Sequence, residues 1–141
     1  MMNAYHMFIG MFVIQYIFMS YVMTNDIKNI KHSNGKIYMS AIMGLFMVVL
    51  GILLNHKIDK KQLLIFTGCL ILFIYLYKIQ FGIDEKNYLQ EMIEHHSMAI
   101  LTSKQILQKT KNSVISNFAT KIVTTQEKEI EDMQYMLRTI Y

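Results

Sequence analysis

Two adjacent histidines stand among methionines in the stretch Met92-Ile93-Glu94-His95-His96-Ser97-Met98. Neither Gly nor Pro interrupts this stretch, so a helix is predicted. Residues three and four positions apart share one face of a helix, which places Met92 beside both His95 and His96. Imidazole and thioether groups on one face suit a soft metal ion, and they favour Cu(I).

Two amphipathic helices are predicted to position these residues. The first begins after an N-cap at Asp84 and runs to about Lys109, and the second begins at Ser113, which can cap it, and runs to the end of the chain. The inward face of the first helix is predicted to carry Tyr88, Met92, His95, His96, Ala99, Ser103 and Ile106. The inward face of the second is predicted to carry Ile115, Phe118, Ile122, Gln126, Glu129, Ile130, Met133, Leu137 and Ile140.

An antiparallel hairpin around residue 111 brings positions at equal distances from the turn side by side. His96 and Gln126 then lie at the same height, and Glu129 and Met133 flank Met92. The predicted metal site therefore consists of Met92, His95, His96, Gln126, Glu129 and Met133.

Neighbouring residues on a helix are about 100° apart, so the two histidines cannot point equally at one ion. We predict that His96 forms the inner site with Met92 and Met133, while Glu129 and Gln126 complete or orient it. The other histidine, His95, would face a second hairpin in a dimer or bridge to a second ion.

The same residues also allow alternatives to a Cu(I) site. A carboxylate ligand would admit Cu(II) or Zn(II), or would orient a histidine from behind. Without any metal, the two histidines would lie at the helix interface and hydrogen-bond to Gln126 and Glu129. The residues three before the histidines are Met92 and Ile93, so the paired Glu-x-x-His motif of di-iron proteins is missing. No enzyme motif is found, and we predict that the protein is not an enzyme.

The histidine stretch and the later Gln126-x-x-Glu129-Ile130-x-x-Met133-x-x-x-Leu137 together resemble the family called domain of unknown function 305. The resemblance covers residues 84–137, and Glu94 replaces the Pro that the family usually has. The membrane half, with Tyr38-Met39, Met43 and Met47, is similar to the members with three spans. This resemblance implies a ferritin-like helical fold and an association with copper, but no established reaction.

Three apolar runs, over residues 4–23, 37–54 and 63–81, are long enough to cross a bilayer. A polar connection over residues 24–36 separates the first two, with a turn expected at Asn34-Gly35. We predict an all-α protein in which three transmembrane helices (residues 1–83) precede an antiparallel helical hairpin (residues 84–141), a ferritin-like half bundle that binds metal. The first span is expected to be retained, since no Lys or Arg precedes it.

Charge is divided unevenly along the chain. Residues 1–83 carry seven Lys and two Asp, a net charge of +5, and residues 84–141 carry six Lys and one Arg against eight acids, a net charge of −1. The basic side chains lie in loops beside apolar runs, which predicts contact with anionic lipid headgroups and not with nucleic acid. The lone Cys69 is expected to be a buried apolar residue.

Topology is predicted with the hairpin on the exported side, which follows the family resemblance. The lysines favour the opposite orientation, a cytoplasmic hairpin. The loop beside the amino terminus carries Lys57, Lys60 and Lys61, and the side of the hairpin carries Lys28, Lys31, Lys36, Lys78 and Lys86. Two helices make a thin core, so a homo-oligomer or docking on the bilayer is expected to cover it.

Three functions follow in order of preference. The first is a membrane-anchored protein that binds a soft metal, copper in particular, for storage, delivery or tolerance. The second is a scaffold whose hairpin mediates oligomerisation without metal. The third is an oxidoreductase subunit.

Overall fold

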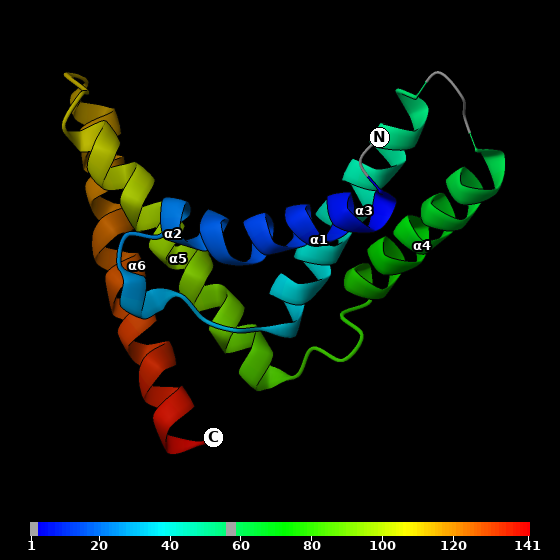
Figure 1. Ribbon diagram of the computed structural model, residues 1–141. Helices are drawn as coiled ribbons and strands as arrows, with labels where there is room; N and C mark the ends of the chain where they lie inside the picture. Colours follow the sequence, from blue (N-terminus) through cyan, green and yellow to red (C-terminus); the bar gives the residue numbers. More distant parts are fainter. Residues whose placement is uncertain (1–2, 56–58) are drawn as a thin grey trace. The chain divides into compact units, whose positions relative to one another are not determined.

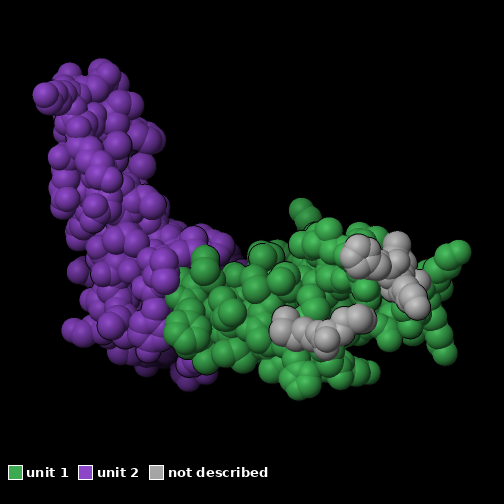
Figure 2. Space-filling view, turned by 45° about the horizontal axis from the view of Figure 1, so that its top comes forward, with its two compact units in different colours: residues 1–19, 34–83 green, residues 20–33, 84–141 purple. Residues whose placement is uncertain are grey.

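The computed structural model describes residues 3–55 and 59–141, and all regular elements in these ranges are helical. This confirms the predicted all-α class, while Lys57 lies outside the described residues. The chain divides into two compact units (Figure 2). Unit 1 comprises Met1–Met19 and Asn34–Ile83, and unit 2 comprises Ser20–Ser33 and Asp84–Tyr141.

Unit 1 is built around α3 (Asn34–Leu53), which packs against both α1 (Ala4–Val13) and α4 (Lys60–Lys78) (Figure 1). A π-helical turn over Ile14–Phe18 follows α1, and α2 (Met19–Met23) completes the same helical run. The buried core of unit 1 contains Ile42, Leu45 and Leu70, and Phe8, Val49, Phe66, Cys69, Phe73, Ile74 and Tyr77 pack against it.

Small residues allow α1 to approach α3 closely. A Cβ atom added to Gly44 would lie 2.8 Å from the Phe8 ring and 3.0 Å from the Phe8 carbonyl oxygen. A Cβ atom on Gly51 would lie 2.2 Å from the terminal methyl group of Met7, which can move more easily. The glycines on the second apolar run therefore form a contact surface for the first helix.

Within the described residues, three helical segments are long and apolar enough to cross a membrane: Ala4–Met23, Asn34–Leu53 and Lys60–Lys78. The first matches the predicted run, whereas the second and third each begin three residues earlier than predicted. The carboxylate of Asp59 accepts hydrogen bonds from the N–H groups of Lys61 and Gln62 and so caps α4 before the apolar run begins.

The ends of these helices explain the remaining differences. Helix α4 stops before the predicted residue 81, because Gln80 (φ 55°) and Gly82 (φ 68°) adopt left-handed conformations. The turn expected at Asn34-Gly35 is wrong, because both residues form the first turn of α3. The Asn34 side chain donates a hydrogen bond of 2.7 Å to the Gly82 carbonyl, so the start of α3 and the exit from α4 lie at the same end of unit 1.

Unit 2 contains the predicted helical hairpin. Helices α5 (Glu85–Leu107) and α6 (Ser113–Thr139) run antiparallel, side by side (Figure 1). Asp84 caps α5 by accepting the Asn87 N–H at 2.7 Å, as predicted. The predicted cap at Ser113 is wrong, because the Asn112 side chain accepts the N–H groups at the start of α6 and leaves Ser113 inside the helix.

The hairpin core is narrower than the predicted inward faces. It consists of Ile93, Ile100, Ile130 and Met133, with Leu89, Met92, Met136 and Leu137 packed against it. Two helices share a single line of contact, so residues beside that line remain exposed to solvent. The members of the predicted faces that are exposed are Tyr88, His95, Ile106, Ile115, Phe118, Glu129 and Ile140.

The connection between the first two apolar segments belongs to unit 2, although we predicted it within the membrane domain of residues 1–83. Residues 20–33, which include a 3₁₀ turn over Ile27–Asn29, pack on the face of α5 that carries Glu94 and Ser97. The predicted boundary between residues 83 and 84 coincides with the later boundary of the two units. Hydrogen bonds between polar side chains and this loop, described below, account for the difference.

Candidate functional site

His96 is held in one orientation at the hairpin interface. Its Nδ1 lies 2.7 Å from the Met92 carbonyl oxygen, and its Nε2 lies 2.9 Å from Oε2 of Glu129 on α6. A carbonyl oxygen only accepts, so Nδ1 carries a hydrogen and donates it. Nε2 is therefore the ring nitrogen that faces the Glu129 carboxylate.

The two histidines differ in exposure, as expected for adjacent residues on a helix. The His96 side chain is 13% exposed and turns toward α6, whereas His95 is exposed. Adjacent residues on α5 point about 100° apart, so only one of them reaches the interface. The structure brings His96, Met92, Glu129 and Met133 to the hairpin interface and leaves His95 outside.

The two predicted thioether ligands lie within the apolar core. Met133 is buried and forms part of the cluster with Ile93 and Ile130, and Met92 packs against this cluster from α5. Methionine serves here as an apolar side chain that fills the interface. Both methionines therefore contribute to the apolar packing of the hairpin that also holds His96.

Glu129, not Gln126, is the partner of His96 on α6. The prediction of His96 and Gln126 at one height assumed that side chains extend straight across the hairpin. Helical side chains lean toward the N-terminus of their own helix, so in an antiparallel pair the matching residue on the second helix lies farther from the turn. Gln126 is partly buried one turn nearer the connection.

A buried carboxylate next to the histidines was missed by the sequence analysis. Glu94, which stands where the family usually has Pro, is 8% exposed. Its Oε1 accepts the Lys31 N–H at 2.6 Å, and its Oε2 accepts the Ser20 hydroxyl at 3.2 Å. Glu94 thus fastens the loop of residues 20–33 to α5, and its position one residue before His95 was the only signal in the sequence.

Ser97, one helical turn after Glu94 on α5, also holds the loop of residues 20–33. Its hydroxyl oxygen accepts the Asn25 N–H at 2.9 Å and the Asn29 side-chain amide at 3.4 Å. The Asn29 side-chain oxygen in turn accepts from Gln134 on α6 at 3.0 Å. We call residues 20–33 the strap, because their polar contacts reach both helices of the hairpin.

Charged groups also mark the start of the hairpin. The Asn87 backbone N–H and side-chain amide donate to Asp84 and hold the pKa of that carboxyl below its usual value of 3.8. The Tyr141 hydroxyl donates to the Glu85 carboxylate, which raises the pKa of Tyr141. The contact between Tyr141 and Glu85 joins the beginning of α5 to the segment after α6.

The donor set at the interface decides which ion would fit. Within residues 3–55 and 59–141, no three His, Cys, Asp or Glu side chains gather as a possible metal site. His96 and Glu129 supply two donors, and further ligands would have to be the thioethers of Met92 and Met133. Imidazole and thioether ligands fit a soft ion such as Cu(I) and do not fit a hard ion such as Mg²⁺.

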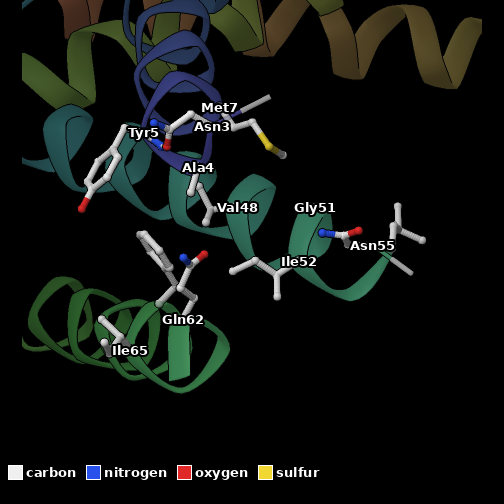
Figure 3. Close-up of a pocket in the computed structure, with 12 residues that line it drawn as sticks. Asn3, Ala4, Tyr5, Met7, Val48, Gly51, Ile52, Asn55, Gln62 and Ile65 are labelled. Carbon is white, nitrogen blue, oxygen red and sulfur yellow. The ribbon is translucent and has the colours of Figure 1, made fainter. Parts of the chain in front are cut away.

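A separate pocket of about 630 Å³ lies in unit 1, where the ends of α1, α3 and α4 meet (Figure 3). Amide side chains of Asn3, Asn55 and Gln62 lie among apolar lining residues. Among the described residues that line it, none is a histidine, cysteine or acid. The remaining lining residues are Ala4, Tyr5, Met7, Val48, Gly51, Ile52, Leu54, Ile65 and Phe66.

The fold and this site define an all-helical protein in which apolar helices of membrane-spanning length precede a hairpin with one oriented histidine. The family described as "Domain of unknown function (DUF305)" matches residues 77–137. "Uncharacterized protein L153" of Acanthamoeba polyphaga mimivirus is 37% identical over 134 residues, which are 93% of this chain and 88% of that protein. No solved structure gives a significant match.

The chain belongs to the DUF305 family. The family match begins near the end of α4 and covers the hairpin with all six predicted site residues. The viral protein is similar over nearly the whole chain, so that likeness includes most of unit 1 and the strap.

Proposed function

We propose that this protein is anchored in a membrane by three spans and binds a soft metal ion, Cu(I) in particular, at its hairpin. Its role would be metal storage, delivery or tolerance, and the hairpin would be a ferritin-like half bundle. The observation that carries the proposal is the orientation of His96 between the Met92 carbonyl and Glu129.

This orientation is the one that metal-ligating histidines adopt. Such a histidine commonly donates one ring N–H to a carbonyl or carboxylate and presents the other nitrogen to the ion. In His96 the Nδ1–H takes the first role, which leaves Nε2 as the ligand atom. Glu129 is half exposed, so its side chain can move to admit an ion beside Nε2 or to join as a ligand.

The thioethers of Met92 and Met133 also support binding of a soft metal ion. Met92 and Met133 belong to the same interface as His96, where Met133 is buried and Met92 is partly buried. A Cu(I) ion is weakly hydrated compared with a hard cation and accepts two or three soft ligands. The six predicted residues therefore resolve into an inner set of His96, Met92, Met133 and Glu129, with Gln126 and His95 beside it.

Contacts within unit 2 also support the three-span arrangement. The strap begins in the last turn of the first span and continues beyond it, and the hairpin follows the third span. Glu94 joins the strap to the hairpin through the Lys31 N–H and the Ser20 hydroxyl. Both segments must therefore lie on one side of the bilayer. This requires that α3 and α4 cross it as a pair, which agrees with their antiparallel packing and their shared end.

Metal binding is tested by titrating detergent-purified protein with Cu(I) under reducing conditions against a chromophoric chelator. Wild type should compete for the ion, His96→Gln should lose binding, and Met133→Leu, which keeps the core filled, should weaken it. His95→Gln is the matched control and should retain the inner site. If wild type takes no Cu(I) from the chelator, or His96→Gln keeps full affinity, the proposal is wrong.

A scaffold without metal is the second candidate. It is favoured by the fact that both ring nitrogens of His96 already have partners across the hairpin. In that case His96→Gln would lower the thermal stability of the hairpin, while added Cu(I) would leave the stability of the wild type unchanged. A homo-oligomer formed through the hairpin would then be detected by light scattering in detergent.

A further inference from the structure

Charge is strongly polarised along the hairpin. Residues 99–125, around the connection between α5 and α6, contain four lysines and no acid, a net charge of +4. The other end, residues 84–98 and 126–141, contains eight acids, two lysines and one arginine, a net charge of −5. We call residues 99–125 the basic tip. One of its lysines, Lys104, pairs with Glu127 at 2.8 Å, and the exposed ones are Lys109, Lys111 and Lys121.

Large apolar side chains are exposed among these lysines. Val114 is 72% exposed and Phe118 is 63% exposed, and both lie in the first two turns of α6. Ile115 on α6 and Ile106 on α5 are exposed beside them. Apolar and cationic groups thus share one end of the hairpin, a combination that burial in the hairpin core does not explain.

The middle of the hairpin has a different surface. Between Ala119 and Gln134, the exposed residues of α6 are all polar or charged. A second hairpin packed lengthwise would place its contact on this polar stretch, where apolar burial is small. Contact at the end of the hairpin uses the exposed apolar residues and the lysines together. The exposed residues of this middle stretch are Thr120, Lys121, Thr124, Thr125, Glu127, Lys128, Glu129, Glu131 and Asp132.

We propose that the basic tip docks on the surface of a bilayer that contains anionic lipids. Lysines attract anionic headgroups, and exposed Phe and aliphatic side chains enter the boundary between headgroups and acyl chains. The chain carries three helices of membrane-spanning length, so bilayer surface is always within its reach.

The test uses the full chain in nanodiscs, with Cys69→Ser and a single Cys in place of Asn117, an exposed residue of the tip. An environment-sensitive fluorophore on this Cys reports contact with lipid. In discs of phosphatidylcholine and phosphatidylglycerol, the emission should shift to the blue and resist quenching by iodide. In phosphatidylcholine alone both effects should be lost, and added salt should reverse them.

Charge and apolar contacts are separated by two variants. Lys109→Gln/Lys111→Gln/Lys121→Gln keeps the apolar residues and should lose the shift, and Phe118→Ser should reduce it. Lys86→Gln/Lys128→Gln is the matched control, since it removes two exposed lysines outside the tip and should leave the shift intact. All replaced side chains are exposed, and circular dichroism checks that each variant keeps its helices.

Several outcomes decide the proposal. A shift in the protein's own disc, or one that appears only when empty vesicles with phosphatidylglycerol are added, supports it and tells which bilayer is bound. An equal shift on both lipid compositions, or none on either, overturns it. A shift that requires two copies in one disc also overturns it, because a second chain would then cover the tip.

Discussion

His96 owes its orientation to a pattern that the sequence displays openly. Met92 and His96 are four residues apart on a helix, so the histidine ring reaches the Met92 carbonyl, which is already part of the helix backbone. Helix geometry alone therefore predicted that one histidine would turn inward. It could not predict the choice of Glu129 over Gln126, because this depends on how far each side chain leans along its helix.

Glu94 shows that the burial of a polar residue cannot always be predicted from its neighbours in the sequence. Its neighbours Glu91 and His95 are polar, and a carboxylate in such a stretch is ordinarily solvated. The structure buries Glu94 because the strap offers it a backbone N–H and a hydroxyl. These partners lie more than sixty residues earlier in the chain, and no local pattern pairs them.

Replacing Glu94 should therefore release the strap. Glu94→Ala leaves the Lys31 N–H and the Ser20 hydroxyl without this partner, which should cost about 1–3 kcal/mol. Glu131→Ala, which removes an exposed carboxylate from α6, is the control and should change stability by no more than about 0.5 kcal/mol. Hydrogen exchange of the amides in residues 25–31 provides the measurement. Equal protection of these amides in wild type and Glu94→Ala would show that the strap is held by other contacts.

Asp84 should make the start of α5 sensitive to acid. Its pKa is lowered by hydrogen bonds from Asn87, so the folded state binds a proton less readily than the unfolded chain. The stabilisation is present above the usual pKa of 3.8 and is lost as the pH falls through the lowered value. Asp84→Asn keeps an N-cap without the ionisable group.

Circular dichroism during acid titration checks this expectation. The difference in stability between wild type and Asp84→Asn should be constant above the usual pKa and should change only at more acidic pH. A difference that changes near neutral pH would assign the effect to another group.

At the scale of elements, local patterns predicted the helices well and their ends less well. The three apolar runs and the hairpin follow from uninterrupted hydrophobicity and from helical spacing. The ends depend on which of several polar residues acts as the cap. Asn112 and Ser113 are both good caps, and Asp59 can cap a helix that begins with two lysines, so hydrophobicity alone placed these ends too late.

The contact between α1 and α3 can be tested through its glycines. Gly44→Ala would bring a methyl group within 2.8 Å of the Phe8 ring and 3.0 Å of its carbonyl, so one helix must shift. Such overpacking should cost about 1–3 kcal/mol. Gly10→Ala and Gly68→Ala are matched controls, since a Cβ atom there has nothing within 4 Å.

Thermal unfolding in detergent, followed by circular dichroism, distinguishes these variants. Gly44→Ala should melt at a lower temperature than wild type, whereas Gly10→Ala and Gly68→Ala should melt at or above it, because Ala favours a helix more than Gly does. A normal melting temperature for Gly44→Ala would mean that α1 does not press on α3 at this position.

At the scale of the whole molecule, the strap changes how the chain is divided. We predicted the segment between the first two spans as a simple connection, yet it forms part of the compact unit that holds the hairpin. It covers one face of α5, so part of the cover that we expected from a homo-oligomer or from the bilayer comes from the same chain. Such a contact between distant segments has no periodic signature in the sequence.

The strap makes a specific prediction of the membrane topology possible. If α3 and α4 cross the bilayer as a pair, then the strap and the hairpin lie on one side and the start of α4 lies on the other. We therefore expect a Cys in place of Lys28 or Lys128 to react with a membrane-impermeant maleimide on intact cells, in a Cys69→Ser background. A Cys in place of Lys60 should react only after lysis. All three positions are exposed, so burial does not protect them.

The pattern of labelling separates the number of spans from their direction. Protection of the Cys at positions 28 and 128 together, with labelling of the Cys at position 60, would reverse the orientation but keep the paired crossing of α3 and α4. Labelling at only one of positions 28 and 128 would contradict the three-span arrangement, because the hydrogen bonds of Glu94 require the strap and the hairpin on the same side. Copper would then be bound on whichever side these two positions share, since His96 lies in the same unit as both.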